Sequence, residues 1–212
     1  LLEDDTTVEV TGSMVSAPYL DVTTHMMRLY GAGVMRTGNS FRISGGDGYS
    51  PYDYSVPADY SSAAFPLVAG ALGGECEVTG MDPDDPQGDK AILDILRSAG
   101  AEIVSNAGTV IASKNRVEGC SVDMGSVPDL FPITAILLSV AEGDSRLYGA
   151  PQLRFKESDR IETTVRMINA LGGDAEGTSD GCVIHGVKRL KGGYVEHHGD
   201  HRIMMSAAVA SI

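Results

Sequence analysis

The sequence predicts a mixed fold of the α/β (α+β) class, in which helices cover sheets. Strand-like and helix-like segments alternate along all 212 residues, and this alternation is typical of layered α/β and α+β domains. Hydrophobic residues make up 42% of the chain and charged residues 21%, so a core can form and disorder is not expected. The same order of segments also recurs along the chain with a long period.

Three aspartates mark the starts of the repeating units. Asp59, Asp129 and Asp200 lie 70 and 71 residues apart, and each opens an apolar segment with a helical pattern. The first two segments close at Gly73 and Gly143, fourteen residues after their aspartates. A period of this length is too long for a solenoid unit. It predicts a few similar units packed around a shared core.

The other elements of each unit follow in a constant order. Short strands are expected at residues 75–79 and 145–148, and a second amphipathic helix follows each of them. These helices end at Gly100 and Gly172, and an equivalent one ends at Gly31, which suits a left-handed residue after a helix. Strand pairs then follow at residues 33–35 with 41–44, 102–105 with 109–112, and 174–176 with 182–185. The unit is therefore helix–strand–helix–strand–strand, and one further strand is expected at residues 7–11.

A domain boundary is predicted near residues 45–58, because turn-forming residues gather at 49–54. Residues 1–58 would form one part, and residues 59–212 would hold two units and the start of a third. The chain opens without an initiator Met and stops inside an apolar helical pattern. We therefore expect it to be an interior piece of a longer protein.

Charge and cysteine content exclude several classes of protein. Lys+Arg 16 against Asp+Glu 29 gives a net charge of −13, so binding to nucleic acid is not expected. Any anionic ligand must be held by a local basic cluster. The three cysteines are far apart, which fits neither a disulfide framework nor a zinc site and favours a reducing compartment. The longest apolar stretch, 131–141, is about half of a membrane span, and a cytoplasmic protein is expected.

Residues 153–161 form the densest charged motif, and two interpretations of it remain open. In the simpler one, Asp159 and Glu162 make a capping box, and Lys156 and Arg160 are solvated surface charges. However, both cations lie at a helix start, where the partial positive charge disfavours them. An anion bound between them would remove this cost, since a helix N-terminus is itself an anion site.

A second motif, Asp200-His201-Arg202, again places a cation in the first turn of a helix. His197 and His198 lie just upstream, but this pair is expected in a loop or at a strand end and not on the helix, so the two residues are not expected to act as helical metal ligands. A capped helix with an anion-binding arginine is therefore favoured over a metal site.

Asp129 also has two interpretations. It occupies the same repeat position as Asp59 and Asp200, so all three could simply cap helices. A carboxylate beside lysine and arginine could instead serve as a general base, and the repeat alone does not say which aspartate would do so. Near the start of the chain, Ser16 and Tyr19 offer two hydroxyls at a helix start, for which an ordinary cap is the simplest interpretation.

Five sequence blocks, in order, carry a resemblance to a known family: residues 15–20, 59–65, 128–129 with 141–143, 153–161 and 200–205. Together they resemble 3-phosphoshikimate 1-carboxyvinyltransferase, also called EPSP synthase, although each block alone is a weak signal. The resemblance implies a two-domain inside-out α/β barrel of repeated βαβαββ units, partial here. Residues 1–58 would be the last unit of the N-terminal-side domain, and residues 59–212 most of the C-terminal-side domain. The family's N-terminal Lys-Ser…Arg cluster and final lysine would lie outside this chain.

The resemblance assigns roles in binding shikimate 3-phosphate and in proton transfer. Ser16 and Tyr19 would contact shikimate 3-phosphate, the serine at its phosphate. Asp129 would contact the shikimate hydroxyls and take the proton of the attacking 5-hydroxyl, with Lys156 near that hydroxyl. Glu157 would exchange protons with the methylene of phosphoenolpyruvate.

The side chains implied to hold phosphoenolpyruvate are Arg160, Arg202 and His201. Gln152 stands where many members have an Asn facing shikimate, which is a departure from the family pattern. Ser61 and Ser62 form a block that we interpret as structural and leave out of the site.

The implied reaction is transfer of the enolpyruvyl group of phosphoenolpyruvate to the 5-hydroxyl of shikimate 3-phosphate, with release of phosphate, in aromatic amino acid biosynthesis. It needs no metal and no cofactor. We expect a monomer at full length and no activity from the 212 residues alone. The alternatives are the UDP-N-acetylglucosamine enolpyruvyl transferase, which shares this fold and chemistry, and a non-catalytic fragment.

Overall fold

The computed structural model describes residues 2–46 and 48–212 of the chain. Contacts divide it into two compact units, Leu1–Val56 with Asp84–Gly88, and Pro57–Pro83 with Asp89–Ile212. The assignment of residues 1–58 and 59–212 to two different domains of the family stays a prediction. No helix in the described ranges is both long enough and apolar enough to cross a bilayer.

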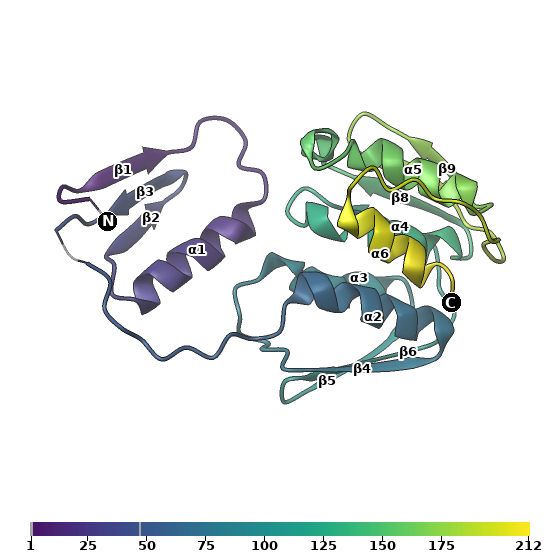
Figure 1. Cartoon of the computed structure of the whole chain (residues 1–212), viewed down its shortest axis with the longest axis horizontal. Helices are drawn as coiled ribbons and strands as arrows, with labels where there is room; N and C mark the ends of the chain where they lie inside the picture. Colours follow the sequence, from purple (N-terminus) through teal and green to yellow (C-terminus); the bar gives the residue numbers. More distant parts are fainter. Residues whose placement is uncertain (1, 47) are drawn as a thin grey trace. The chain divides into compact units, whose positions relative to one another are not determined.

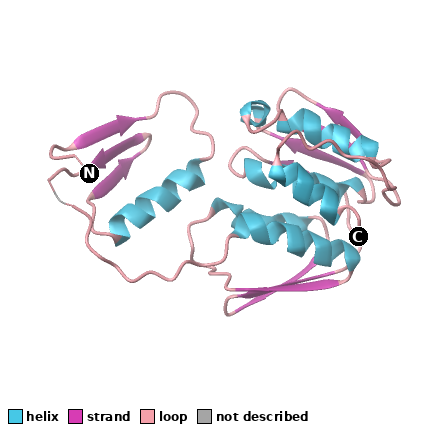
Figure 2. Ribbon diagram, viewed as in Figure 1, coloured by secondary structure: helices cyan, strands magenta, loops and turns pink. Residues whose placement is uncertain are grey.

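The first unit consists of one helix and a three-stranded sheet (Figures 1 and 2). Its elements are, in chain order, β1 (Thr6–Glu9), α1 (Ala17–Leu29), β2 (Val34–Thr37) and β3 (Ser40–Ile43). The strand order is β1-β3-β2, and both pairs are antiparallel. The strand expected at residues 7–11 therefore ends two residues early, at Glu9, an offset that is normal for the end of an element.

The core of the first unit is thin. Among its described residues, the buried hydrophobic side chains are Ala32, Val34 and Phe41. In the helix α1, Thr24 is the one buried residue. Tyr30 adds edge-on contacts to the rings of Tyr49 and Tyr52. One helix and a narrow sheet bury little apolar area, which is the main stabilising term in folding.

The second unit begins with one complete copy of the predicted repeat. Its elements are α2 (Tyr60–Gly73), β4 (Glu75–Thr79), α3 (Ala91–Ser98), β5 (Glu102–Asn106) and β6 (Thr109–Ser113). The three strands form an antiparallel sheet in the order β4-β6-β5. This order of elements confirms the helix–strand–helix–strand–strand pattern.

A second copy follows and carries one additional strand. Its elements are β7 (Ser121–Asp123), α4 (Phe131–Ser139), β8 (Asp144–Tyr148), α5 (Arg160–Ala170), β9 (Asp174–Gly177) and β10 (Cys182–His185), and α6 (His201–Val209) comes after them. The sheet order is β7-β8-β10-β9, in which β7 and β8 are parallel. With β7 included, this copy has the βαβαββ order that the family resemblance implied.

Helices occupy the interior of the second unit, and sheets cover it (Figure 1). The helix α4 packs against α2, α5 and α6, while α2 also packs on the strands β4 and β6. All nine residues of α4 are buried, as expected for a helix that is apolar on every side. The unit therefore has the inside-out arrangement that the family resemblance implied, and not the layering with helices outside the sheets that the alternation of segments predicted.

Glycines end three helices at the predicted positions. Gly31, Gly100 and Gly172 follow α1, α3 and α5, and their φ angles are 90°, 88° and 77°. A side chain is disfavoured in this left-handed region. The prediction of left-handed glycines at these helix ends is therefore confirmed.

Candidate functional site

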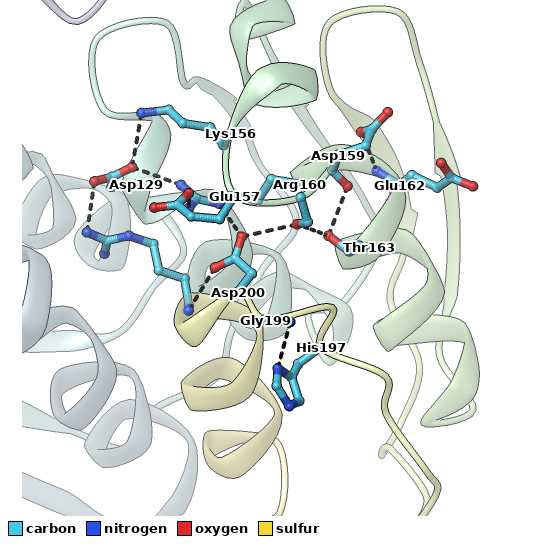
Figure 3. A network of polar contacts seen from close by, with 12 residues as sticks. Asp129, Lys156, Glu157, Asp159, Arg160, Glu162, Thr163, His197, Gly199 and Asp200 are labelled. Carbon is cyan, nitrogen blue, oxygen red and sulfur yellow. Dashed lines mark hydrogen bonds and ion pairs between the residues drawn. The ribbon is translucent and has the colours of Figure 1, made fainter.

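The candidate site is a cluster of charged side chains where α4, α5 and α6 begin (Figure 3). Asp129 lies in a 3-10 turn, Pro128–Leu130, just before α4. Arg160 is the first residue of α5, and Arg202 is the second residue of α6. Because the three helices pack against one another, segments far apart in the sequence meet at one end of the helical interior.

Two aspartates cap the helices that carry the arginines. Asp159 accepts a hydrogen bond from the amide of Glu162 at 3.0 Å, and Asp200 accepts one from the amide of Arg202 at 2.9 Å. These contacts satisfy amides that have no partner within the helix. The capping box predicted at Asp159 is only half formed, because the carboxylate of Glu162 pairs with Arg166 instead.

Asp129 does not cap α4, so the simpler interpretation of this residue is wrong. A capping carboxylate accepts from an amide two or three residues further on. The amide of Phe131 already donates to the carbonyl of Pro128, and Pro132 has no N–H to donate. The carboxylate of Asp129 is therefore available to side chains.

Three cations surround the carboxylate of Asp129 (Figure 3). Its Oδ1 lies 2.9 Å from Nη1 of Arg160 and 3.6 Å from Nζ of Lys156, and its Oδ2 lies 2.8 Å from Nη2 of Arg202. Burial alone would raise the pKa of Asp129, but Arg202, Lys156 and Arg160 outweigh it and hold the pKa below its ordinary value. The carboxylate is therefore ionised at neutral pH.

Arg160 is completely buried, so its interpretation as a solvated surface charge is wrong. Its Nε donates to Oδ2 of Asp200 at 2.9 Å, its Nη1 to Asp129, and its Nη2 to Glu157. Both Arg160 and Asp200 have no exposed side-chain surface. A buried guanidinium needs such partners, since an unpaired charge in the interior is strongly destabilising.

Asp200 connects α5 to α6. One oxygen caps α6 through the amide of Arg202, and the other accepts from Arg160 and, at 3.1 Å, from the hydroxyl of Ser158. Burial would raise the pKa of Asp200, but the hydrogen bond and charge of Arg160 and the other donors lower it. One carboxylate therefore holds the side chain of Arg160 and the backbone of Arg202.

Arg202 has a second partner, which the sequence interpretation missed. Its Nη1 donates to the hydroxyl of Ser61 at 2.7 Å. Ser61 is 8% exposed and is the second residue of α2, as Arg202 is of α6. The repeat contained this signal, because Ser61 and Arg202 each stand two residues after a repeat aspartate.

Two other residues predicted for the site, Glu157 and His201, lie at its margin, and Gln152, the departure from the family pattern, has a partner outside the cluster. Glu157 is half exposed and reaches the cluster through Arg160. His201 is exposed at the start of α6, and no contact described for the second unit joins it to the cluster. Gln152 donates to the carbonyl of Gly125 at 3.1 Å, while its buried Oε1 lacks a partner in the described part of the chain.

Ser16 and Tyr19 belong to the first unit. Ser16 precedes α1 with φ 55°, and its side chain makes no capping hydrogen bond. The cap expected there is therefore absent, because a left-handed residue does not have the extended conformation of an N-cap. The roles of both residues in binding shikimate 3-phosphate stay predictions.

His197 and His198 do not take part in a metal site among the described residues. The Nδ1 of His197 accepts from the amide of Gly199 at 3.1 Å, and His198 lies near Glu196. In residues 2–46 and 48–212, no group of three or more His, Cys, Asp and Glu side chains is arranged to hold a metal ion.

A cavity of about 720 Å³ lies at the other ends of the same helices. Its lining includes Ala71 of α2, Ile136 of α4 and Val209 of α6, with exposed lysines such as Lys114 and Lys188 beside it. The charged cluster contributes nothing to this lining. We place the candidate site at the cluster, because a carboxylate whose pKa is shifted by specific charge partners is a mark of functional sites.

Comparison with known proteins gives a consistent result over the whole chain. The family described as EPSP synthase (3-phosphoshikimate 1-carboxyvinyltransferase) matches residues 1–212. The 3-phosphoshikimate 1-carboxyvinyltransferases of Methanocorpusculum labreanum and Brachyspira hyodysenteriae are 45% and 40% identical over 98% and 100% of this chain. The chain spans 49% and 51% of their lengths. EPSP synthase from Acinetobacter baumannii has a similar structure, with a TM-score of 0.80 and 30% identity over 98% of this chain and 50% of its own.

Proposed function

Because the chain belongs to the EPSP synthase family, we propose that a protein carrying it at the family's full length transfers the enolpyruvyl group of phosphoenolpyruvate to the 5-hydroxyl of shikimate 3-phosphate. Phosphate is the second product. One observation carries the proposal: Lys156 and Arg160 of the motif at residues 153–161, and Arg202 at the start of α6, converge on Asp129.

The cluster suits a small polyanion. The chain has a net charge of −13, so a phosphate and a carboxylate need locally concentrated positive charge. Arginine offers a planar fork that matches both groups with paired hydrogen bonds, and a partly dry site strengthens these bonds. Arg160 and Arg202 hold phosphoenolpyruvate in this proposal, with His201 beside them, and Lys156 lies near the attacking hydroxyl.

Binding of phosphoenolpyruvate makes Asp129 a better base. Without substrate, the guanidinium groups of Arg202 and Arg160 hold the Asp129 carboxylate in its ionised form. When those groups turn to phosphoenolpyruvate, Asp129 loses charge partners and its pKa rises. Asp129 therefore becomes a stronger base when phosphoenolpyruvate is bound.

The chemistry balances as an addition followed by an elimination. Asp129 takes the proton of the 5-hydroxyl while that oxygen attacks carbon 2 of phosphoenolpyruvate, and carbon 3 gains a proton to become a methyl group. Phosphate then leaves carbon 2 and a proton leaves carbon 3, which restores the double bond as an enol ether. Glu157 is the proposed proton carrier at carbon 3, and its half-exposed carboxylate beside Arg160 is within the cluster.

The remaining parts of the proposal concern the rest of the protein. Ser16 and Tyr19 bind shikimate 3-phosphate, and closure of two domains excludes water during the reaction. The full-length enzyme works as a cytoplasmic monomer on two small-molecule substrates. The 212 residues alone do not catalyse the reaction, because some of the residues that bind the anionic substrates lie outside them. Incubating the purified chain with both substrates and measuring phosphate release tests this last point.

Substitution of Arg202 by Lys tests the proposed role of the cluster. In the full-length protein, Arg202→Lys keeps the charge and loses the fork. We expect the KM for phosphoenolpyruvate to rise about tenfold or more, while the KM for shikimate 3-phosphate stays within about twofold. Equal increases for both substrates would contradict the assignment of Arg202 to phosphoenolpyruvate.

A further inference from the structure

Ser61 makes a contact that the proposed function does not use. Its hydroxyl, on the first turn of α2, accepts from Nη1 of Arg202 at 2.7 Å. The two residues are 141 positions apart in the sequence. Ser61 is 8% exposed, so this hydrogen bond is largely protected from water.

We propose that Ser61 is a positioning residue that orients Arg202 for phosphoenolpyruvate. This inference rests on the proposed function, in which Arg202 binds that substrate. The guanidinium of Arg202 is held at two adjacent nitrogens, by Ser61 at Nη1 and by Asp129 at Nη2. Two contacts at the terminal nitrogens, together with the attachment of the guanidinium to its own side chain, determine its plane.

The two contacts to Arg202 differ in charge, and this difference affects the binding of phosphoenolpyruvate. The Asp129 carboxylate neutralises Arg202 and competes with an incoming anion for it. The Ser61 hydroxyl is neutral, so it holds the guanidinium without reducing its charge. When phosphoenolpyruvate takes the Nη2 side, the Ser61 contact remains and keeps the side chain oriented. Holding a binding group in place beforehand lowers the entropic cost of binding.

The neighbouring serine supplies a matched control. The hydroxyl of Ser62 donates to Oδ2 of Asp59 at 2.5 Å, so it serves the cap of α2. The backbone amide of Ser61 also donates to Asp59, at 2.9 Å. Substitution of Ser61 by Ala leaves that backbone bond intact and removes the hydroxyl contact to Arg202.

The test compares variants of the full-length protein at both substrates. We expect Ser61→Ala to raise the KM for phosphoenolpyruvate about tenfold, as for loss of a hydrogen bond to a charged group. We expect kcat and the KM for shikimate 3-phosphate to change by less than about twofold. Ser61→Thr keeps the hydroxyl and restores most of the KM. Ser62→Ala lowers Tm through the weakened cap and leaves both KM values unchanged.

Two results would overturn the inference: equal KM values for Ser61→Ala and the unaltered protein, or a KM for Ser61→Thr as high as that for Ser61→Ala. If Ser61→Ala does not fold, Ser61→Cys replaces it, because a thiol has a similar size and is a weak acceptor.

Arg202→Ala separates this inference from the proposed function. If Arg202→Ala raises the KM for phosphoenolpyruvate but Ser61→Ala does not, the role of Ser61 alone is wrong. If Arg202→Ala leaves that KM unchanged, the proposed role of the cluster in binding phosphoenolpyruvate is wrong, whatever Ser61 does. In the variant that combines Ser61→Ala with Arg202→Ala, we expect the same KM for phosphoenolpyruvate as in Arg202→Ala alone, since the two groups act through one contact.

Discussion

The starts of α2 and α4 occupy the same position in the repeat and use their aspartates differently. At α2, Asp59 accepts from the amides of Ser61 and Ser62, at 2.9 and 3.0 Å, and serves as a helix cap. At α4, Asp129 instead binds the side chains of Arg160 and Arg202.

The difference comes from the residues that follow each aspartate. Ser62 provides an N–H three residues after Asp59, whereas Pro132 stands three residues after Asp129 and provides none. Since the amide of Phe131, two residues after Asp129, donates to the carbonyl of Pro128, neither capping amide is offered to Asp129, and its carboxylate binds the arginines. Pro132 and the 3-10 turn before α4 together separate a capping aspartate from one that binds side chains.

Asp200, at the third start, does both. It caps α6 with one oxygen and binds the buried Arg160 with the other. The three equivalent aspartates thus form a series: Asp59 is a cap, Asp200 is both a cap and an ion-pair partner, and Asp129 is an ion-pair partner alone. Substitution of each by the same residue type tests this series.

The largest effect is expected on turnover. In the full-length protein, Asp129→Asn removes the proposed base, and kcat should fall about 10²- to 10⁴-fold. Asp59→Asn keeps a good capping residue, so kcat should be unchanged. Steady-state phosphate release gives kcat for both variants. A similar kcat for the two would contradict the assignment of Asp59 as a cap and Asp129 as the base.

The second effect concerns the free energy of unfolding. Asp200→Ala leaves the buried Arg160 without a partner, and we expect a loss of about 3–5 kcal/mol. Asp59→Ala removes a cap at a surface helix start, and we expect a loss of about 1 kcal/mol. Urea unfolding at pH 7 gives both values, and equal losses would show that Asp200 acts only as a cap.

The third effect is a dependence of stability on pH. The pKa values of Asp129 and Asp200 are lowered in the folded state. Their contribution is therefore complete above the ordinary carboxyl pKa of about 4 and is lost as pH falls through the lower folded values. Urea unfolding between pH 7 and pH 3 should show this loss. In Asp200→Asn the free energy of unfolding should fall less between pH 7 and pH 3. The same dependence on pH as in the unaltered protein would contradict the role of Asp200.

The smallest effect is expected from Pro132→Ala. The new N–H can bind the Asp129 carboxylate and draw it partly away from the arginines. We expect stability to change by less than about 1 kcal/mol and kcat to fall less than in Asp129→Asn. Pro66→Ala, within α2, is the control and should leave kcat unchanged. If Pro132→Ala has the kcat of the unaltered protein, the proline does not keep Asp129 from capping.

Short-range sequence patterns determine much of the fold. The order of helices and strands, the left-handed glycines after α1, α3 and α5, and the caps at Asp159 and Asp200 all follow from residues within one turn of each other. Helix periodicity and end signals are local, so the sequence contains them completely. The strand β7 and the 3-10 turn at Pro128–Leu130 were not predicted, because three-residue elements have too short a pattern.

The composition of the site was also visible in the sequence, since cations at helix starts need an anion to offset the helix dipole. Its arrangement was decided by tertiary structure alone. Packing of α2, α4, α5 and α6 buries Arg160, joins Asp200 to it, and brings Ser61 to Arg202 across 141 residues. It also makes Asp129, rather than Asp59 or Asp200, the carboxylate that faces three cations. Burial and pairing of charges depend on which surfaces of the helices meet. The repeat in the sequence treats the three aspartates as equivalent, so it does not show which of them will face the cations.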